Sequence, residues 1–158
     1  MLFFYILVVP LSVFLHEMGH ALAALVLTKR TVLIYMGANK RRQKATLILG
    51  RLQFYFTWGF MGSVATKEDE KQLSKYQNIG ISIGGPLVSL FLVIVMIVLY
   101  FSIQMRPFFD NIVFAAGVFN LINLCVTLIP TIYSTGPYAG LPSDGYQILT
   151  AMGKGKIH

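Results

Sequence analysis

Three long apolar stretches dominate the pattern of hydrophobic and polar positions along the chain. They cover residues 1–28, 78–104 and 111–133, and the only Asp, Glu, Lys or Arg residue within them is Glu17. A helix rises about 1.5 Å per residue, so each stretch is long enough to cross a hydrocarbon core of about 30 Å. The pattern predicts three transmembrane helices that belong to a single domain over residues 1–158.

The segment between the first two stretches has a different pattern. Residues 51–57 alternate between apolar and polar side chains, and two further runs at 31–36 and 47–49 are rich in residues that favour strands. We therefore expect a β-rich segment at about 31–60, folded as a hairpin or small sheet against the membrane. The predicted fold class is an all-α polytopic membrane protein with three transmembrane helices and this small β element between the first two.

The composition agrees with a membrane-embedded chain. Of the 158 residues, 56% are hydrophobic and only 12% are charged, whereas soluble domains carry about 25% charged residues. Such a chain has too few polar side chains to cover a soluble core, and its hydrophobicity excludes an intrinsically disordered protein. We expect an integral membrane protein in contact with the lipid bilayer.

Basic residues are concentrated beside the predicted spans. The formal net charge is +7, and ten of the 13 basic residues lie between Lys29 and Lys75. By the positive-inside tendency, the segment 29–77 is cytoplasmic and the N-terminus lies outside. The basic run at 40–44 then faces anionic lipid headgroups rather than nucleic acid. The compact core and this charge bias favour the plasma membrane of a bacterium.

Ionisable residues are costly inside a membrane span, at roughly 2.5–3.5 kcal/mol for a charged group on insertion scales. The first span nevertheless contains the sequence His16-Glu17-Met18-Gly19-His20, which is the motif H-E-x-x-H. Residues four apart share one face of a helix, so both imidazoles can bind one ion, while Glu17 is turned about 100° away and can act on a water molecule. The motif predicts one zinc ion per chain with His16 and His20 as ligands. A proton relay or another cofactor site is the alternative for such a pair.

A catalytic zinc site needs a third protein ligand in addition to water. Asp144 follows the third predicted span, which runs back towards the cytoplasmic side, where the first span also ends. Asp110 belongs to the opposite membrane face, Cys125 lies within an apolar helix, and His158 is at the chain end. Elimination and topology thus favour Asp144, with a simple Asp-Gly turn as the alternative.

This arrangement resembles the site-2 protease family of intramembrane zinc metalloproteases. The matching motifs are His16-Glu17-Met18-Gly19-His20 in the first span, Gly85-Pro86 in the second, and Asp144-Gly145 after the third. The family also carries a membrane-associated β-rich segment between its first two core helices, and the resemblance covers nearly the whole chain. It implies a zinc metalloendopeptidase with Asp144 as the third metal ligand and Glu17 as the general base.

Departures from the family pattern concern the second and third motifs. The family places an asparagine three residues before a proline, but Thr127 holds that position before Pro130. Asn123, one helical turn earlier, is then the candidate for a hydrogen bond to the oxyanion, with a helix–helix contact as its alternative role; Asn120 is a further turn away. Ser89 stands where an asparagine is common. The gap between Pro130 and Asp144 is long for the family, as though a loop had been inserted.

The expected function is hydrolysis of a peptide bond within or near a transmembrane segment of a membrane protein or peptide. A transmembrane helix shields its own peptide bonds, so the substrate must unwind locally before water can attack. The strands within 31–57 are candidates for pairing with the unwound segment. Two alternatives remain open: a family member without turnover that acts as a binding or scaffold protein, and a metal or proton transporter.

Overall fold

Three long apolar helices run through the structure, a computed structural model that describes residues 4–37, 45–57, 59–67, 72–103 and 106–153. The first helix combines a π-helical turn, η1 (Phe4–Val8), with α1 (Val9–Leu27), and the others are α2 (Lys75–Ser102) and α3 (Pro107–Leu128). Each is long and apolar enough to cross a membrane. Helix α2 begins before residue 78, and α3 lies a few residues earlier than the expected range 111–133.

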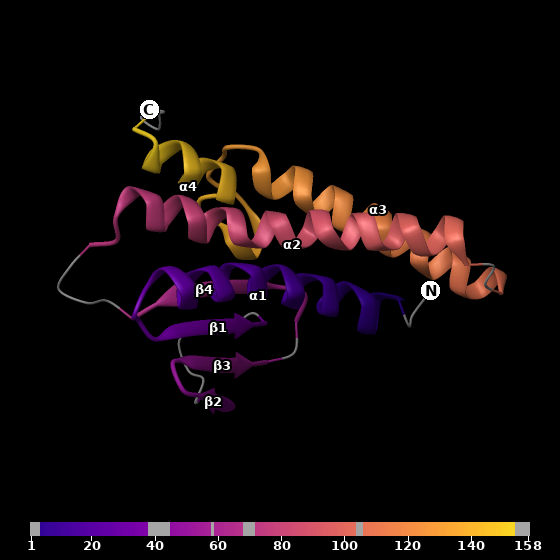
Figure 1. The fold of residues 1–158 in the computed structure, drawn as a ribbon, viewed down its shortest axis with the longest axis horizontal. Coiled ribbons are helices and arrows are strands. Elements are labelled where there is room, and N and C mark those ends of the chain that lie inside the picture. Colours follow the sequence, from indigo (N-terminus) through magenta and orange to yellow (C-terminus); the bar gives the residue numbers. More distant parts are fainter. Residues whose placement is uncertain (1–3, 38–44, 58, 68–71, 104–105, 154–158) are drawn as a thin grey trace.

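The helices lie side by side, and the β element lies on one side of them (Figure 1). Helix α1 lies between the sheet and α2, and α3 runs back along α2 in the opposite direction. A short fourth helix, α4 (Asp144–Ala151), packs against the N-terminal part of α2. The C-terminal end of α1, the N-terminal end of α2 and α4 therefore gather at the same end of the molecule.

A four-stranded mixed sheet follows α1 in the sequence, where a small β element was expected, so the class label all-α is not exact. The strands are β1 (Val32–Met36), β2 (Leu47–Leu49), β3 (Leu52–Phe56) and β4 (Gly62–Thr66), in the spatial order β2-β3-β1-β4. Strand β1 pairs parallel with β3 and antiparallel with β4. Strand β4 lies beyond the expected limit of residue 60. The sequence did not predict it, because its small residues give little strand pattern and the strand is stabilised by its pairing with β1.

One face of the sheet packs against α1. The buried positions alternate along the strands, as the pattern of residues 51–57 predicts, and they contact small or branched residues of α1: the cluster consists of Val32, Ile34, Met36, Leu52 and Phe54 with Val13, Ala21 and Ala24. The rings of Phe14 and Phe56, 5.8 Å apart, extend this contact. The sheet therefore fixes one side of the helix that carries the H-E-x-x-H motif.

On another side, α1 approaches α2 closely through two glycines. A methyl group on Gly19 would overlap the carbonyl of Gly84, and a methyl group on Gly84 would overlap the carbonyl of Gly19. Small residues of this kind allow membrane helices to pack backbone against backbone. Because Gly19 lies between His16 and His20, this contact brings both histidines against α2.

The C-terminal end of α1 is capped by side chains from two other elements. The Arg51 guanidinium donates to the carbonyls of Thr28 and Leu25, at 2.6 Å and 2.9 Å. The Gln77 amide donates to the Leu27 carbonyl at 2.8 Å. These carbonyls have no partner within the helix, and a cation is favourable beside them because the C-terminus of a helix carries partial negative charge.

The chain after α3 makes a compact loop before α4. Pro130 disfavours helix at the residue before it, and Ile129 is accordingly extended. The Ser143 hydroxyl accepts the N–H of Tyr146 at 3.2 Å and donates to the Ile129 carbonyl at 2.7 Å. Ser143 thus caps α4 and ties its start to the end of α3, which places Asp144 at the first position of α4.

Replacing Arg51 by glutamine should lower the melting temperature by several degrees. The end of α1 loses a charged donor, and hydrogen bonds to charged groups contribute about 1.5–3 kcal/mol, less when partly exposed. Arg51→Lys should recover only part of the loss, since an ammonium group lacks the two-pronged geometry. The melting temperature is measured by thermal unfolding in detergent, monitored by circular dichroism. Lys67→Gln is the control for the loss of an exposed charge. Equal melting temperatures for Arg51→Gln and the control would contradict the capping role.

Candidate metal centre

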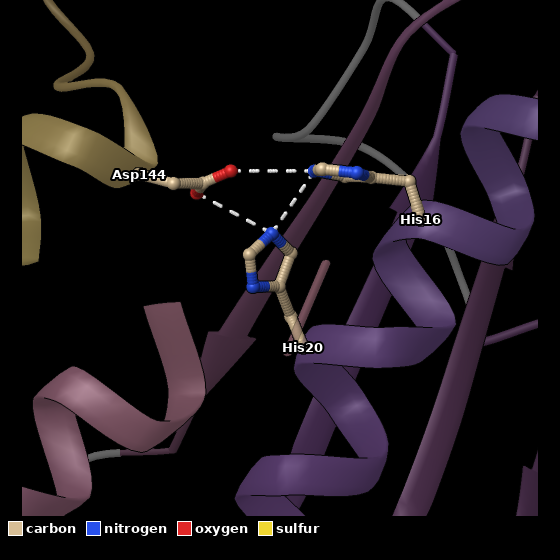
Figure 2. A group of neighbouring side chains, drawn as sticks. All are labelled: His16, His20 and Asp144. Atoms are coloured by element: carbon tan, nitrogen blue, oxygen red, sulfur yellow. Dashed lines mark hydrogen bonds and ion pairs between the residues drawn. The ribbon is translucent and has the colours of Figure 1, made fainter. Parts of the chain in front are cut away.

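Two side chains of α1 and one of α4, far apart in the sequence, lie close together (Figure 2). The Nε2 atom of His16 lies 3.3 Å from Asp144 Oδ2, the Nε2 atom of His20 lies 3.3 Å from Asp144 Oδ1, and the two Nε2 atoms are 3.2 Å apart. All three residues are buried. Among the described residues they form the one group of histidine, cysteine and acidic side chains whose donor atoms converge on a common point.

Two helices position these ligands. Residues four apart in α1 lie on one face, so the two imidazoles are neighbours, with ring centroids 4.9 Å apart and an interplanar angle of 80°. Asp144 reaches them from the first turn of α4, whose position depends on the compact loop after α3. The structure therefore brings together the three residues expected to bind a metal.

A backbone carbonyl orients the imidazole of His20. Its Nδ1 atom lies 2.7 Å from the carbonyl oxygen of Ile81, which can only accept, so Nδ1 carries a proton. The N–H of Gly85 lies 3.3 Å from the same nitrogen, but the shorter contact with the carbonyl determines the tautomer. Neutral His20 therefore presents the lone pair of Nε2 to the centre, the arrangement that metal-binding histidines usually adopt.

Ser89 is the corresponding partner of His16. The Nδ1 atom of His16 lies 2.8 Å from Ser89 Oγ, and the amide of Asn123 donates to the same oxygen at 3.3 Å. A hydroxyl oxygen has two lone pairs, so Ser89 can accept from both groups. Ser89 is 0% exposed, and this network links α3 and α2 to the imidazole on α1 while leaving Nε2 to face Asp144.

Two glycines allow neighbouring helices to reach the centre. A methyl group on Gly85 would overlap the Nε2 atoms of both His16 and His20, so α2 can lie against the imidazoles only with glycine at this position. A methyl group on Gly145 would overlap the carbonyl of Leu128 at the end of α3. The Gly-Pro motif and the Asp-Gly motif of the sequence thus have a common physical reason, which is close backbone packing around the ligands.

Glu17 lies beside the three ligands and not among them. It is buried and lines the same cavity. Gly62, the first residue of β4, lies directly against it, because a methyl group on Gly62 would overlap the Glu17 side chain. Glu17 therefore shares one cavity with the three side chains that could hold a metal.

A cavity of about 560 Å³ contains the whole group. Its walls come from α1, α2, α3, β4 and the loop between α3 and α4, and they are mostly apolar. Polar side chains other than the ionisable group also face it, among them Asn123, Thr127, Tyr133 and Tyr138. Ligand sites commonly have volumes of about 300–1,000 Å³, with a few polar groups in an apolar lining.

The remaining candidate residues from the sequence differ in their positions relative to the cavity. Asn123 lines the cavity, as its candidate role requires. Asn120 is buried and donates to Ser12 Oγ at 3.1 Å, and it is not part of the cavity wall. Cys125 is exposed, and His158 lies outside the described residues.

Two residues of the site, Ser89 and Tyr138, were not predicted from the sequence to have a functional role. Ser89 had a usable signal, because it is a polar residue in an apolar span and lies one helical turn after Gly85, on the same face. Tyr138 had none, because it lies in an irregular loop rich in glycine and proline, where no periodicity shows which side chains turn inwards.

The fold and the site together define a class of protein, an apolar helical protein with an H-E-x-x-H centre completed by an aspartate. The sequence model of peptidase family M50, the site-2 protease family, matches residues 4–151, and the chain belongs to this family. Searches of curated proteins and of solved structures gave no significant match. The resemblance inferred from the motifs is confirmed.

The donor atoms fit zinc, the metal on which this family depends. Two imidazole nitrogens and one carboxylate oxygen, with water in the fourth position, form a catalytic zinc site. The two imidazole Nε2 atoms are 3.2 Å apart, and each lies 3.3 Å from a different carboxylate oxygen of Asp144. The chemistry and the close grouping of these donors therefore suit such an ion.

Ser89→Ala should weaken zinc binding about 10–100-fold, the usual effect of removing a group that orients a metal-binding histidine. Competition with a fluorescent zinc chelator in detergent measures the affinity. Ser12→Ala is the matched control, because it removes another buried serine hydroxyl from an asparagine contact without touching an imidazole. Equal zinc affinity for the two variants would show that Ser89 does not orient His16.

Proposed function

We propose that this chain is an intramembrane zinc metalloprotease, one domain over residues 1–158, that hydrolyses a peptide bond within or near a transmembrane segment of a membrane protein or peptide. The observation that carries this proposal is the position of Glu17 beside the three metal-binding side chains, in one cavity between apolar helices. Membership of peptidase family M50 supports the same reaction class.

The proposed mechanism assigns each step to a group of this chain. Zinc held by His16, His20 and Asp144 would supply a Lewis acid and a water molecule of lowered pKa. The Glu17 carboxylate accepts a proton from the attacking water and later transfers it to the leaving amine nitrogen. Asn123, on the cavity wall, is a candidate donor to the carbonyl oxygen as that oxygen becomes negative.

Strand β4 supports a site for the unwound substrate. It forms one edge of the sheet and lines the cavity with Gly62, Ser63 and Val64. Strands β1 and β3 are each paired on both sides, and β2 forms the far edge. Substrate pairing is therefore proposed at β4, outside the range 31–57 that the sequence suggested.

The register of β4 identifies the groups that such a substrate would meet. Gly37 donates to the Met61 carbonyl at 2.8 Å, and Lys67 donates to the Thr31 carbonyl at 2.9 Å, so the odd-numbered residues of β4 bond to β1. Hydrogen-bonded and non-hydrogen-bonded pairs alternate along an antiparallel ladder. The even-numbered residues, Val64 among them, thus turn their N–H and C=O groups towards the outer edge.

An apolar groove supports entry of the substrate from the lipid. It has a volume of about 460 Å³ and is lined by residues of η1, α1 and α3 and by Phe60. Val9, Phe60 and Phe119 line both this groove and the metal cavity, so the two spaces adjoin. A transmembrane segment in this groove would reach the metal centre without crossing a polar surface.

The proposed membrane orientation follows the charge distribution. Most basic residues lie between Lys29 and Lys75, so we place segment 29–77 with the sheet on the cytoplasmic side and the N-terminus outside. His16 lies near the middle of the helix formed by η1 and α1, and His20 lies one turn closer to the end that leads into this segment. The bacterial plasma membrane is the proposed location.

Asp144→Ala should reduce bound zinc from about one ion per chain to a small fraction, because a site with two imidazoles lacks its anionic ligand. Metal analysis of the purified protein, after dialysis against a weak chelator, measures the ratio. Asp110→Ala, at the far end of α3, is the matched control and should retain zinc. A zinc content that is unchanged in Asp144→Ala would assign the third ligand elsewhere.

Glu17→Gln should retain zinc and lose at least about 10²-fold in cleavage rate, because the amide cannot accept the proton from water. The assay uses a pool of fluorescence-quenched transmembrane peptides in detergent, and a strong chelator should abolish cleavage by the unmodified protein. Zinc binding without any cleavage by the unmodified protein would favour the scaffold function, to which Thr127 in place of asparagine already points. Metal flux in vesicles without cleavage would favour a transporter.

A further inference from the structure

The long loop between α3 and α4 folds over the metal cavity with a defined structure. A bridge pairs Ile132 with Pro142, and the Tyr133 carbonyl accepts the N–H of Gly140 at 2.8 Å. Gly140 has a φ of 81°, a conformation that glycine adopts without strain. A single helical turn, Gly136–Tyr138, forms the tip of the loop, and the Tyr138 side chain lines the cavity.

The hydroxyl of Tyr138 is held beside the proposed general base. The Tyr138 oxygen accepts the N–H of Gly62 at 3.0 Å. Gly62 is the residue that lies against the Glu17 side chain. The phenol therefore bridges the loop and the edge strand β4 at the point where that strand meets the catalytic cavity.

The Tyr138 hydroxyl can act as a hydrogen-bond donor from this position. Its oxygen accepts from Gly62, and its single O–H remains able to donate to a third group. Burial raises the pKa of Tyr138 to about 12, so the hydroxyl keeps its proton throughout the range in which a zinc protease works. Gly62 N–H, by donating to the oxygen, also polarises the O–H and makes it a better donor.

The polar side chains of α3 near the cavity have other partners. Thr127, which occupies the position of the family's asparagine, donates its hydroxyl to the Leu124 carbonyl at 3.3 Å. Asn123 donates to Ser89 and so belongs to the network that orients His16. One of the two N–H groups of the Asn123 amide is thus engaged in positioning His16, and a group from another element can supply the contact to the oxyanion.

We propose that Tyr138 donates a hydrogen bond to the carbonyl oxygen of the scissile peptide as that oxygen gains negative charge, and so replaces the asparagine that this sequence lacks. The inference rests on the proposed function. It makes Tyr138 a catalytic residue supplied by the loop between Pro130 and Asp144, and it assigns Asn123 to positioning.

The test uses acetohydroxamate as a small anionic metal ligand and needs no substrate. Cobalt-loaded protein in detergent is titrated with acetohydroxamate, and the visible absorption of cobalt reports binding. Tyr138→Phe should bind the probe about tenfold more weakly, the effect of losing one hydrogen bond to a charged oxygen. Tyr146→Phe, which removes a hydroxyl outside the cavity, should bind as the unmodified protein does.

Three outcomes separate this inference from the proposed function. Equal probe affinity for Tyr138→Phe and the unmodified protein would overturn the role of Tyr138 and leave the protease proposal intact. Loss of cobalt binding in Tyr138→Phe would also overturn the role of Tyr138, because the phenol would then be required for the structure of the metal site and not for the oxyanion. Failure of the unmodified protein to bind cobalt would instead overturn the metal site itself.

Cleavage of the quenched transmembrane peptides supplies the second readout. Tyr138→Phe should lower kcat about 10²-fold with little change in KM, as loss of an oxyanion donor does. A change confined to KM would overturn the inference, because it would place Tyr138 in substrate binding alone. Asn123→Leu should instead lower zinc affinity, and a loss of kcat with normal zinc affinity in that variant would identify Asn123 as the donor.

Discussion

The structure depends on the need to give partners to ionisable side chains buried in an apolar helix. An H-E-x-x-H motif within a span is costly unless other elements come close enough to pair with it. Ser89 and the Ile81 carbonyl meet the imidazoles from α2, and Asp144 meets them from α4. Each approach requires a position without a side chain, and Gly85 and Gly145 provide two of them. Packing and metal chemistry are therefore one constraint in this protein.

The same helix is held from a second side by the sheet. The buried alternation of β1 and β3 packs on α1, and Arg51 anchors the sheet to the carbonyls at the end of that helix. This arrangement places the edge strand β4 beside Glu17. A small sheet thus fixes one side of the helix that carries the two histidines, and it positions the only sheet edge, among the described strands, that lines the cavity.

Those features that depend on local pattern could be predicted from the sequence. Apolar length indicates the three spans, and the spacing of His16 and His20 on a helix indicates a shared ligand face. Asp144 depends on a long-range contact, so elimination, topology and the family motif were needed to find it. Strand β4 was not predicted, because small residues carry no strand signal and its partner strand is distant in the sequence. The small sheet between the first two helices was expected, but its four-stranded extent made the label all-α inexact, since pairing between distant strands is not revealed by a single segment.

The departures from the family pattern become consistent when the loop is considered together with the site. Without an asparagine at position 127, α3 offers Asn123, and that amide contacts Ser89 and supports the ligand geometry. The long segment between Pro130 and Asp144 adds a phenol that is anchored to β4 through Gly62. An extended substrate on this edge would run towards that same hydroxyl. Pairing of the substrate and stabilisation of its carbonyl would then be coupled through one strand, and a loop insertion would compensate for a lost helix side chain.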